Sequence, residues 1–254
     1  MSTHMSKLEI TGTGLKLIAV ITMLIDHIGA GILRRMLLTG GTTGFESIIG
    51  TYDLYSLTRA IGRMAFPIYC YLLVEGFIHT RNIGKYAMRL FIVAVISEIP
   101  FDYAIHDSYF YLEHNNVLWT LLLGLGVMYG FSLVEFSGLS FELQYILRII
   151  IMFSGMALAY VTKLDYKHSG ICCIAVMYYL YSNDRYKRLF SVSFGILILT
   201  LMSSKLELWA FFILIPMYFY QGNRGADSKA LRTFFYLFYP IHLLILGIVA
   251  YLLF

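Results

Sequence analysis

Two adjacent ionisable residues, Asp26 and His27, interrupt a long apolar segment that spans residues 15–38. If this segment is a helix that enters a membrane at residue 15, Asp26 lies about 16 Å deep at 1.5 Å per residue, close to the midplane. An ionisable side chain there costs about 3 kcal/mol or more, so each is a candidate functional residue. The two side chains point about 100° apart on a helix, so each needs its own partner. The pair could move protons in a reaction, or it could only hold helices together.

Further polar residues follow in the next apolar segments. Arg63 could pair with Asp26, bind an anion, or reach toward water at the membrane interface. Glu75 and His79 are four residues apart, so they share one face of a helix. Asn116 or its neighbour Asn115 could be the N-cap of the segment that follows.

Basic residues recur at every fourth position in the next segment, at Arg81, Lys85 and Arg89. If this segment is helical, the three side chains form one stripe, which could bind phosphate groups. The excess of Lys and Arg in cytoplasmic segments of membrane proteins explains the same residues without a ligand. Both interpretations remain open from the sequence.

The composition requires lipid as the solvent of these segments. Apolar residues make up 59% of the chain and charged residues 13%, with a mean hydropathy of +0.73, whereas soluble chains carry roughly 25% charge. Runs of about 20 apolar residues match a bilayer core of roughly 30 Å. The sequence therefore predicts an all-α, polytopic transmembrane bundle of about nine helices. The predicted spans are residues 15–38, 61–78, 86–104, 117–136, 143–161, 169–181, 189–202, 208–220 and 231–254.

Connections between these spans are short, which predicts one transmembrane domain over residues 15–254. Residues 1–14 are expected to form a tail that could in part be an expression remnant ahead of Met5, and residues 39–59 the longest connection. A cytoplasmic N-terminus places eleven Lys and Arg residues on the cytoplasmic side and seven on the other, as the positive-inside rule favours. The seven exceptions are Arg34, Arg35, Arg59, Arg63, Lys163, Lys167 and Lys205.

The cysteines and the net charge exclude other classes of protein. Cys70, Cys172 and Cys173 lie in apolar runs without zinc-type spacing, so no metal site and no disulfide framework are predicted. The net charge of +4 is too small to indicate nucleic-acid binding. Membrane lipid is the expected partner, and a homo-oligomer remains open.

Several short motifs recur along the chain in a characteristic order. They are Asp26-His27-Ile28-Gly29, Gly62-Arg63, Phe66-Pro67-Ile68, Glu75-Gly76-Phe77, His79-Thr80-Arg81-Asn82, Pro100-Phe101-Asp102, Asp165-Tyr166 and Tyr239-Pro240-Ile241-His242. This ordered set resembles the TraX family over residues 15 to about 243. The family pattern has a glycine after Asp-Tyr, where this sequence has Lys167-His168. This difference weakens the resemblance only in that loop.

The resemblance implies a bacterial inner-membrane acetyltransferase that uses acetyl-CoA, distantly similar to the heparan-glucosaminide N-acetyltransferase type. A pilin N-terminus, another peptide or an amino sugar could be the acceptor. On this hypothesis His27 is the general base, or it accepts the acetyl group in a two-step route. The other assignments are Asp26 paired with Arg63, Glu75 at the acceptor amine or as a second proton carrier, Asn116 at the oxyanion, and His79, Thr80, Arg81, Lys85 and Arg89 at the coenzyme phosphates.

Two other classes fit the same residues. A proton-coupled transporter could use Asp26, His27 and Glu75 as a relay, although the sequence has none of the internal repeats that transporters usually show. An assembly factor for a surface appendage could use polar pairs only to join helices.

Overall fold

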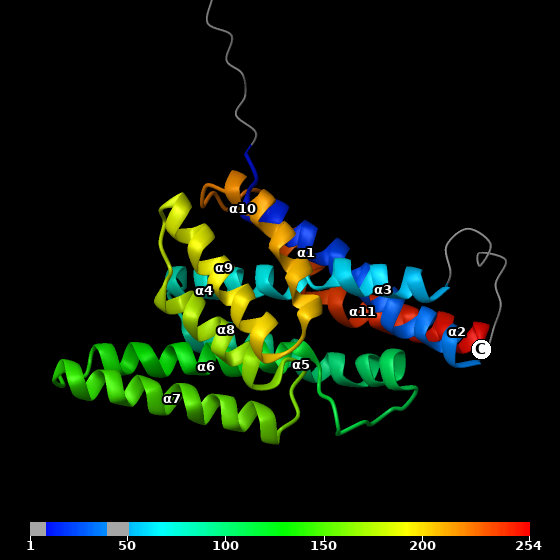
Figure 1. Ribbon diagram of the computed structural model, residues 1–254, viewed down its shortest axis with the longest axis horizontal. Helices are drawn as coiled ribbons and strands as arrows, with labels where there is room; N and C mark the ends of the chain where they lie inside the picture. The colour runs from blue at the N-terminus through cyan, green and yellow to red at the C-terminus, as the bar shows by residue number, and fades with distance from the viewer. Residues whose placement is uncertain (1–8, 40–50) are drawn as a thin grey trace, which may run out of the picture.

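In the computed structural model, which describes residues 9–39 and 51–254, the chain forms nine helical passes, and these residues contain no β-strand (Figure 1). This confirms the predicted all-α bundle. The passes are α1 (Gly12–His27) with the π-helix η1 (Ile28–Leu33) and α2 (Arg34–Thr39); α3 (Thr51–Gly62) with α4 (Ala65–His79); α5 (Ile83–His106); α6 (Val117–Glu135); α7 (Phe141–Val161); α8 (Lys167–Tyr179); α9 (Arg185–Met202); the 3₁₀-helix η3 (Lys205–Ile213) with α10 (Leu214–Phe219); and α11 (Lys229–Leu253).

Short polar side chains begin most of these passes. A hydroxyl, amide or carboxylate oxygen just before the helix accepts a hydrogen bond from a first-turn N–H group, which satisfies a donor that the helix leaves free. The capping residues are Thr11, Asn82, Asn116, Ser140, Asp184, Ser204 and Ser228. The caps explain why connections of only a few residues suffice between passes.

The second pass is longer than the apolar pattern predicts. Residues 51–59 were expected to belong to a long connection, but they lie within α3, which continues through a turn at Arg63 and Met64 into α4. The expectation was wrong because Asp53 and five residues with hydroxyl groups interrupt the apolar run, although they do not prevent a helix. Residues 40–50 and the predicted tail up to residue 8 lie outside the described residues.

Five of the described helical stretches are long and apolar enough to cross a membrane. They are Gly12–Thr39, Asp53–His79, Val117–Glu135, Phe141–Val161 and Lys229–Leu253. α7 shows the expected outward apolar face, because Ile146, Ile150 and Phe153 are exposed while Gly155 and Ala159 are buried. Such a face is stable only against hydrocarbon or another apolar surface.

The connections gather at two ends of the bundle. At one end, here called the α4–α5 end, Ile10 at the start of the chain pairs with Tyr220 after α10. At the other, called the α5–α6 end, Asn115 pairs with Leu164, which joins the α5–α6 and α7–α8 connections. The C-terminus lies beside α2 in Figure 1.

Two arginines that oppose the predicted charge bias stabilise the end of α5. The guanidinium groups of Arg34 and Arg35 donate to the carbonyls of Ile105 and Tyr103, at 3.3 and 2.7 Å. The last carbonyls of a helix have no partner within the helix and attract cations. Arg35 also pairs with Asp107, the left-handed residue that ends α5, at 3.1 Å. These two exceptions are thus explained by packing within the protein.

Candidate functional site

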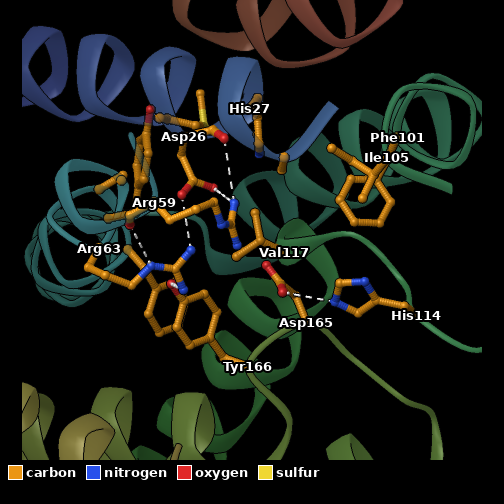
Figure 2. A pocket seen from close by; sticks show the side chains of 16 residues that line it. Asp26, His27, Arg59, Arg63, Phe101, Ile105, His114, Val117, Asp165 and Tyr166 are labelled. Atoms are coloured by element: carbon orange, nitrogen blue, oxygen red, sulfur yellow. Dashed lines mark hydrogen bonds and ion pairs between the residues drawn. The ribbon is translucent and has the colours of Figure 1, made fainter. Parts of the chain in front are cut away.

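Asp26 is the centre of a buried charge network that joins α1 to α3 (Figure 2). Its two carboxylate oxygens accept from different arginines: Oδ2 from Arg59 at 2.5 Å and Oδ1 from Arg63 at 3.0 Å. The side chain of Asp26 is only 13% exposed, against 25% for Arg59 and 15% for Arg63. The sequence suggested Arg63 as one possible partner of Asp26, and the structure contains this pair together with a second arginine.

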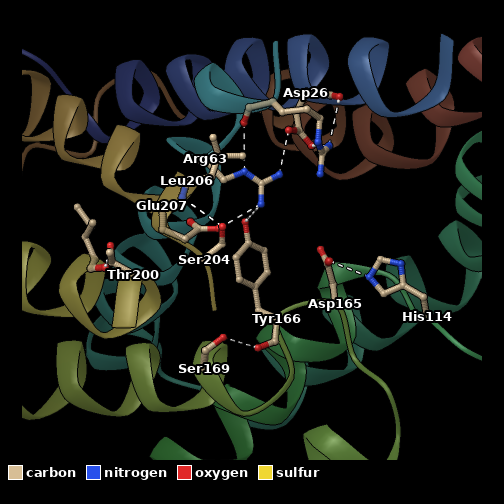
Figure 3. A network of polar contacts seen from close by, with 12 residues as sticks. Asp26, Arg63, His114, Asp165, Tyr166, Ser169, Thr200, Ser204, Leu206 and Glu207 are labelled. Atoms are coloured by element: carbon tan, nitrogen blue, oxygen red, sulfur yellow. Dashed lines mark hydrogen bonds and ion pairs between the residues drawn. The ribbon is translucent and has the colours of Figure 1, made fainter. Parts of the chain in front are cut away.

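Arg63 extends the network to the last passes of the bundle (Figure 3). Its Nη1 group lies 3.2 Å from Oε1 of Glu207 on η3 and 3.4 Å from the hydroxyl of Tyr166. Glu207 is almost completely buried. The two carboxylates, Asp26 and Glu207, balance the two guanidinium groups, which makes a buried network of zero net charge possible.

Two glycines allow α1 and α3 to approach closely enough for these contacts. A Cβ atom on Gly62 would lie 2.0 Å from Oδ1 of Asp26, and one on Gly29 would lie 2.2 Å from Oγ1 of Thr58. Gly29 belongs to the π-helix η1, which follows His27 directly. π-Helical turns are frequent at functional sites because they displace side chains from the regular helical register.

His27 contacts a second histidine, on the last helix. Its Nδ1 atom lies 2.6 Å from Nε2 of His242, and Nδ1 of His242 lies 2.7 Å from the carbonyl oxygen of Phe238. A carbonyl only accepts, so Nδ1 of His242 carries a proton, and Nε2 of the neutral ring is then a lone pair. His27 must donate from Nδ1 to this lone pair. The neutral His27 ring therefore has its free lone pair on Nε2.

A third polar group lies at the α5–α6 end, where His114 and Asp165 face each other across two connections. Nε2 of His114 lies 2.9 Å from Oδ1 of Asp165, and its Nδ1 lies 3.1 Å from Nε2 of His106. Burial lowers the pKa of His114, but the hydrogen bond and charge of Asp165 outweigh it and raise the pKa above its ordinary value. Burial raises the pKa of Asp165, but His114 outweighs this and lowers it. An ion pair is the expected state.

Members of all three groups line one cavity, shown in Figure 2: Asp26, His27, Arg59, Arg63, His114, Asp165 and Tyr166. It contains about 620 Å³ of space between atoms, part of it continuous with the outside. Asp26, His27 and the arginines lie on one wall, and His114 and Asp165 on another (Figure 2). The remaining wall is largely apolar, with Met23, Phe66, Tyr69, Phe101, Ile105 and Val117. A small polar reacting group could enter this space beside a base, two guanidinium groups and a carboxylate.

Two residues assigned from the sequence lie away from the cavity. Glu75 accepts from the hydroxyl of Tyr220 at 2.7 Å, at the α4–α5 end; along α4 it is about 18 Å from Arg63. Asn116 is the N-cap of α6, and its amide group donates to Ala94 and to Glu98. Both N–H groups of Asn116 are thereby used, so the expectation that it faces an oxyanion conflicts with its position.

The basic stripe also differs from its sequence pattern. Lys85 and Arg89 lie on α5, but Arg81 precedes the helix, so the three do not share one helical face. Neither Thr80 nor His79 extends the stripe into α5, because α4 ends at His79. All three basic residues are exposed, and no described ion pair includes them. Arg89 is about 18 Å of helix away from Phe101 in the cavity wall.

Sequence reasoning did not assign several residues that the fold brings to the cavity. Asp165, Tyr166 and His242 belong to motifs noted in the sequence, and His114 directly precedes Asn115. No spacing indicated that Arg59, His114, Asp165 and Tyr166 meet at the cavity, or that His242 contacts His27. Glu207 was not singled out at all. The signal available for Glu207 was a carboxylate at the edge of an apolar run, which by itself is ordinary for an interface.

Comparison with known proteins adds an independent observation. The sequence matches the TraX protein family over residues 11–250. It is 29% identical over 251 residues to the "Probable fimbrial assembly protein FimC, serogroup H1" of Dichelobacter nodosus, which covers 91% of this chain and 92% of that protein. No solved structure matches the chain. Since the family match extends over nearly the whole sequence, this chain belongs to the TraX family.

Proposed function

We propose that this protein is an integral membrane acetyltransferase, which moves acetyl from acetyl-CoA to an amine or hydroxyl of an acceptor such as a pilin-like N-terminus, another peptide or an amino sugar. Membership of the TraX family and the similarity to a fimbrial assembly protein support the class of activity. The observation that carries the proposal is the free Nε2 lone pair of His27 beside two arginines in one cavity.

His27 is the proposed general base. As the acceptor attacks the thioester carbonyl, Nε2 takes the proton of the amine or hydroxyl and then returns it to the departing thiolate, so that a C–N or C–O bond replaces the C–S bond. His242 holds the ring in the tautomer that this step needs, because it accepts only from a protonated Nδ1. His27 itself could also receive the acetyl group in a two-step route.

Arg59 is the proposed stabiliser of the oxyanion, in place of Asn116. Only its Nη1 group contacts Asp26, and its Nε and Nη2 groups donate to no described residue, although the side chain lines the cavity. Donors aimed at a developing negative charge commonly contribute a factor of about 10²–10³ to the rate. Asp26 and Arg63 are positioning residues on this proposal, since they orient Arg59 and the turn that follows α3.

Donor binding would use the α4–α5 end of the bundle, which we place on the cytoplasmic side of a bacterial inner membrane together with the N-terminus. Exposed cations at Arg81, Lys85 and Arg89 fit phosphate groups in charge. Because these three residues lie away from the cavity, the part of acetyl-CoA that carries the acetyl group would have to extend from the α4–α5 end to the cavity. Arg89→Gln should therefore raise the KM for acetyl-CoA and leave kcat almost unchanged.

The test uses full-length protein in lipid nanodiscs, acetyl-CoA, and peptide or amino-sugar acceptors, with acetylated product measured by mass spectrometry. We expect His27→Ala to lower kcat by roughly 10²–10⁴-fold, and His168→Ala to serve as the matched histidine control without effect. His168 lies on α8 and makes no described hydrogen bond. Full activity of His27→Ala would refute the base assignment. Proton flux without acetyl transfer to any acceptor would favour the transporter alternative.

A further inference from the structure

Two separate histidines, His27 and His114, line the cavity, and the proposed reaction uses only His27. His27 on α1 lines the cavity and contacts His242 on α11 behind it, whereas His114 and Asp165 come from the connections at the α5–α6 end. Both His27 and the His114–Asp165 pair line the same space (Figure 2). Two proton-accepting groups on one small cavity indicate chemistry in which two protons must move.

An amine acceptor has this requirement, and a hydroxyl acceptor does not. An α-amino group has a pKa of about 8, so at neutral pH it arrives mostly as an ammonium ion. It must lose one proton before its nitrogen has a lone pair for attack. The second proton leaves as the C–N bond forms, and through His27 it reaches the thiolate. The first proton has no destination in that scheme and must leave the site.

We propose that Asp165, His114 and His106 form a relay that accepts the first proton of an ammonium acceptor and carries it out of the cavity. This inference rests on the proposed acetyltransferase function and assigns positions to residues that the function does not yet use. Asp165 is the entry, because it lines the cavity and its Oδ1 already holds His114. His106, at the end of α5, is the exit.

The relay conserves protons at each step. The ammonium group gives one proton to the Asp165 carboxylate and becomes a neutral amine. His114, protonated in the ion pair, passes its Nδ1 proton to Nε2 of His106 across 3.1 Å. His106 then releases its Nδ1 proton to water. Rotation of the neutral His114 ring turns its unprotonated nitrogen toward Asp165, which passes its proton to this ring and restores the ion pair, and proton exchange with water returns His106 to its starting tautomer. One proton enters at Asp165 and one leaves at His106.

The surroundings of His106 suit its role as the exit. Burial and the charges of His114 and Arg34 lower the pKa of His106 to about 4, so this ring gives up a proton readily at neutral pH. The ring of Tyr111 stacks on His106, with centroids 4.1 Å apart. The charged groups that face the relay are Arg34 at His106, Lys167 and Glu98 at His114, and Arg59 and Arg63 at Asp165.

The test compares two peptide acceptors whose reacting nitrogens differ in charge at neutral pH. One is a short peptide with a free N-terminal α-amine, and the other is the same peptide with an N-terminal aminooxy group, which is uncharged at pH 7. Initial acetyl transfer is measured from pH 6 to 9 in nanodiscs for the wild type, His106→Gln and the matched control His168→Gln. A second reading, free of turnover, is the His114 titration followed by NMR with labelled histidine.

On our inference, His106→Gln slows transfer to the amine peptide by about 10-fold or more at pH 7. The rate recovers as the pH rises past the pKa of the amine, and transfer to the aminooxy peptide is unchanged. The His114 titration shifts in His106→Gln but not in His168→Gln. Equal slowing of both acceptors, or no slowing of either, would overturn the relay and leave the acetyltransferase proposal intact. A wild-type protein that acetylates neither peptide nor any other acceptor would overturn both.

Discussion

Asp26→Asn should be among the most destabilising single changes in this protein. The substitution keeps the size of the side chain but removes the charge that faces Arg59 and Arg63. Arg63 retains Glu207 at 3.2 Å, whereas Arg59 has no other described carboxylate. The network thus changes from zero to one net positive charge inside the bundle.

The expected magnitude follows from this loss of balance. Removing one partner of a buried ion pair costs about 3–5 kcal/mol, because the remaining charge is left uncompensated. Arg59→Gln alone should cost less, since Asp26 still has Arg63. In the double variant Asp26→Asn/Arg59→Gln, the pair of Arg63 and Glu207 remains balanced. The loss of unfolding free energy in the double variant should therefore be smaller than the sum of the losses in the two single variants by about 1–3 kcal/mol.

Reversible unfolding in mixed micelles measures these free energies. The matched control is the ion pair of Lys163 and Glu113, whose side chains are 41% and 63% exposed. Neutralising either of them should change the free energy of unfolding by no more than about 1 kcal/mol. If the double variant at Asp26 and Arg59 is additive to within about 0.5 kcal/mol, the two groups do not form the charge-balanced network described here.

Two further predictions concern the same cavity. Gly62→Ala should destabilise the protein by about 1–3 kcal/mol in the same assay, because the added Cβ would overlap Asp26. In the control Gly126→Ala the added Cβ meets no atom within 4 Å, so this variant should be neutral or slightly stabilising. Equal effects of the two substitutions would contradict the close approach of α1 and α3. The pKa of His114 is raised above 6.5, so the protonated ring stabilises the folded state fully below pH 6.5, and this stabilisation is lost as the pH rises through the pKa in the folded protein. The pKa of Asp165 is lowered, so its carboxylate stabilises the folded state above about pH 4 and less at lower pH. The Tm difference between wild type and Asp165→Asn should therefore be largest from about pH 4 to 6.5 and shrink toward pH 9, and a difference independent of pH would refute the ion pair.

The sequence predicts most of the fold because membrane helices leave strong apolar runs. α6 and α7 begin and end within two residues of their predicted bounds. The predicted bounds are wrong where a helix contains polar residues, because hydropathy does not detect it. Residues 51–59 of α3 include Asp53, Arg59 and several residues with hydroxyl groups, so their mean hydropathy is that of a connection although they form a helix. The irregular pass of η3 and α10 was predicted to start at residue 208, which left Glu207 outside it.

The site was only partly predictable, because its members meet through tertiary packing. Asp26 and His27 stand out in sequence, since a charge in an apolar run is costly. Nothing along the chain indicates that His242, 215 residues later, reaches His27. Glu75 was grouped with Asp26 and His27 as a possible proton carrier, yet it lies on α4 at the α4–α5 end, away from both. The place of a polar residue within a predicted span indicates its depth in the membrane, but it does not indicate which residues on other helices it contacts.

The pairing of Arg63 with Glu207 has a consequence for how the chain is made. The two residues are 144 positions apart. At synthesis rates of about 5–20 residues per second, Arg63 waits roughly 7–29 s before its second carboxylate leaves the ribosome. During that interval Asp26 serves both arginines alone, in a bundle that still lacks η3 and α11. During synthesis the surplus positive charge therefore needs water or lipid headgroups as its partner, and this network is complete only when the eighth pass has been made.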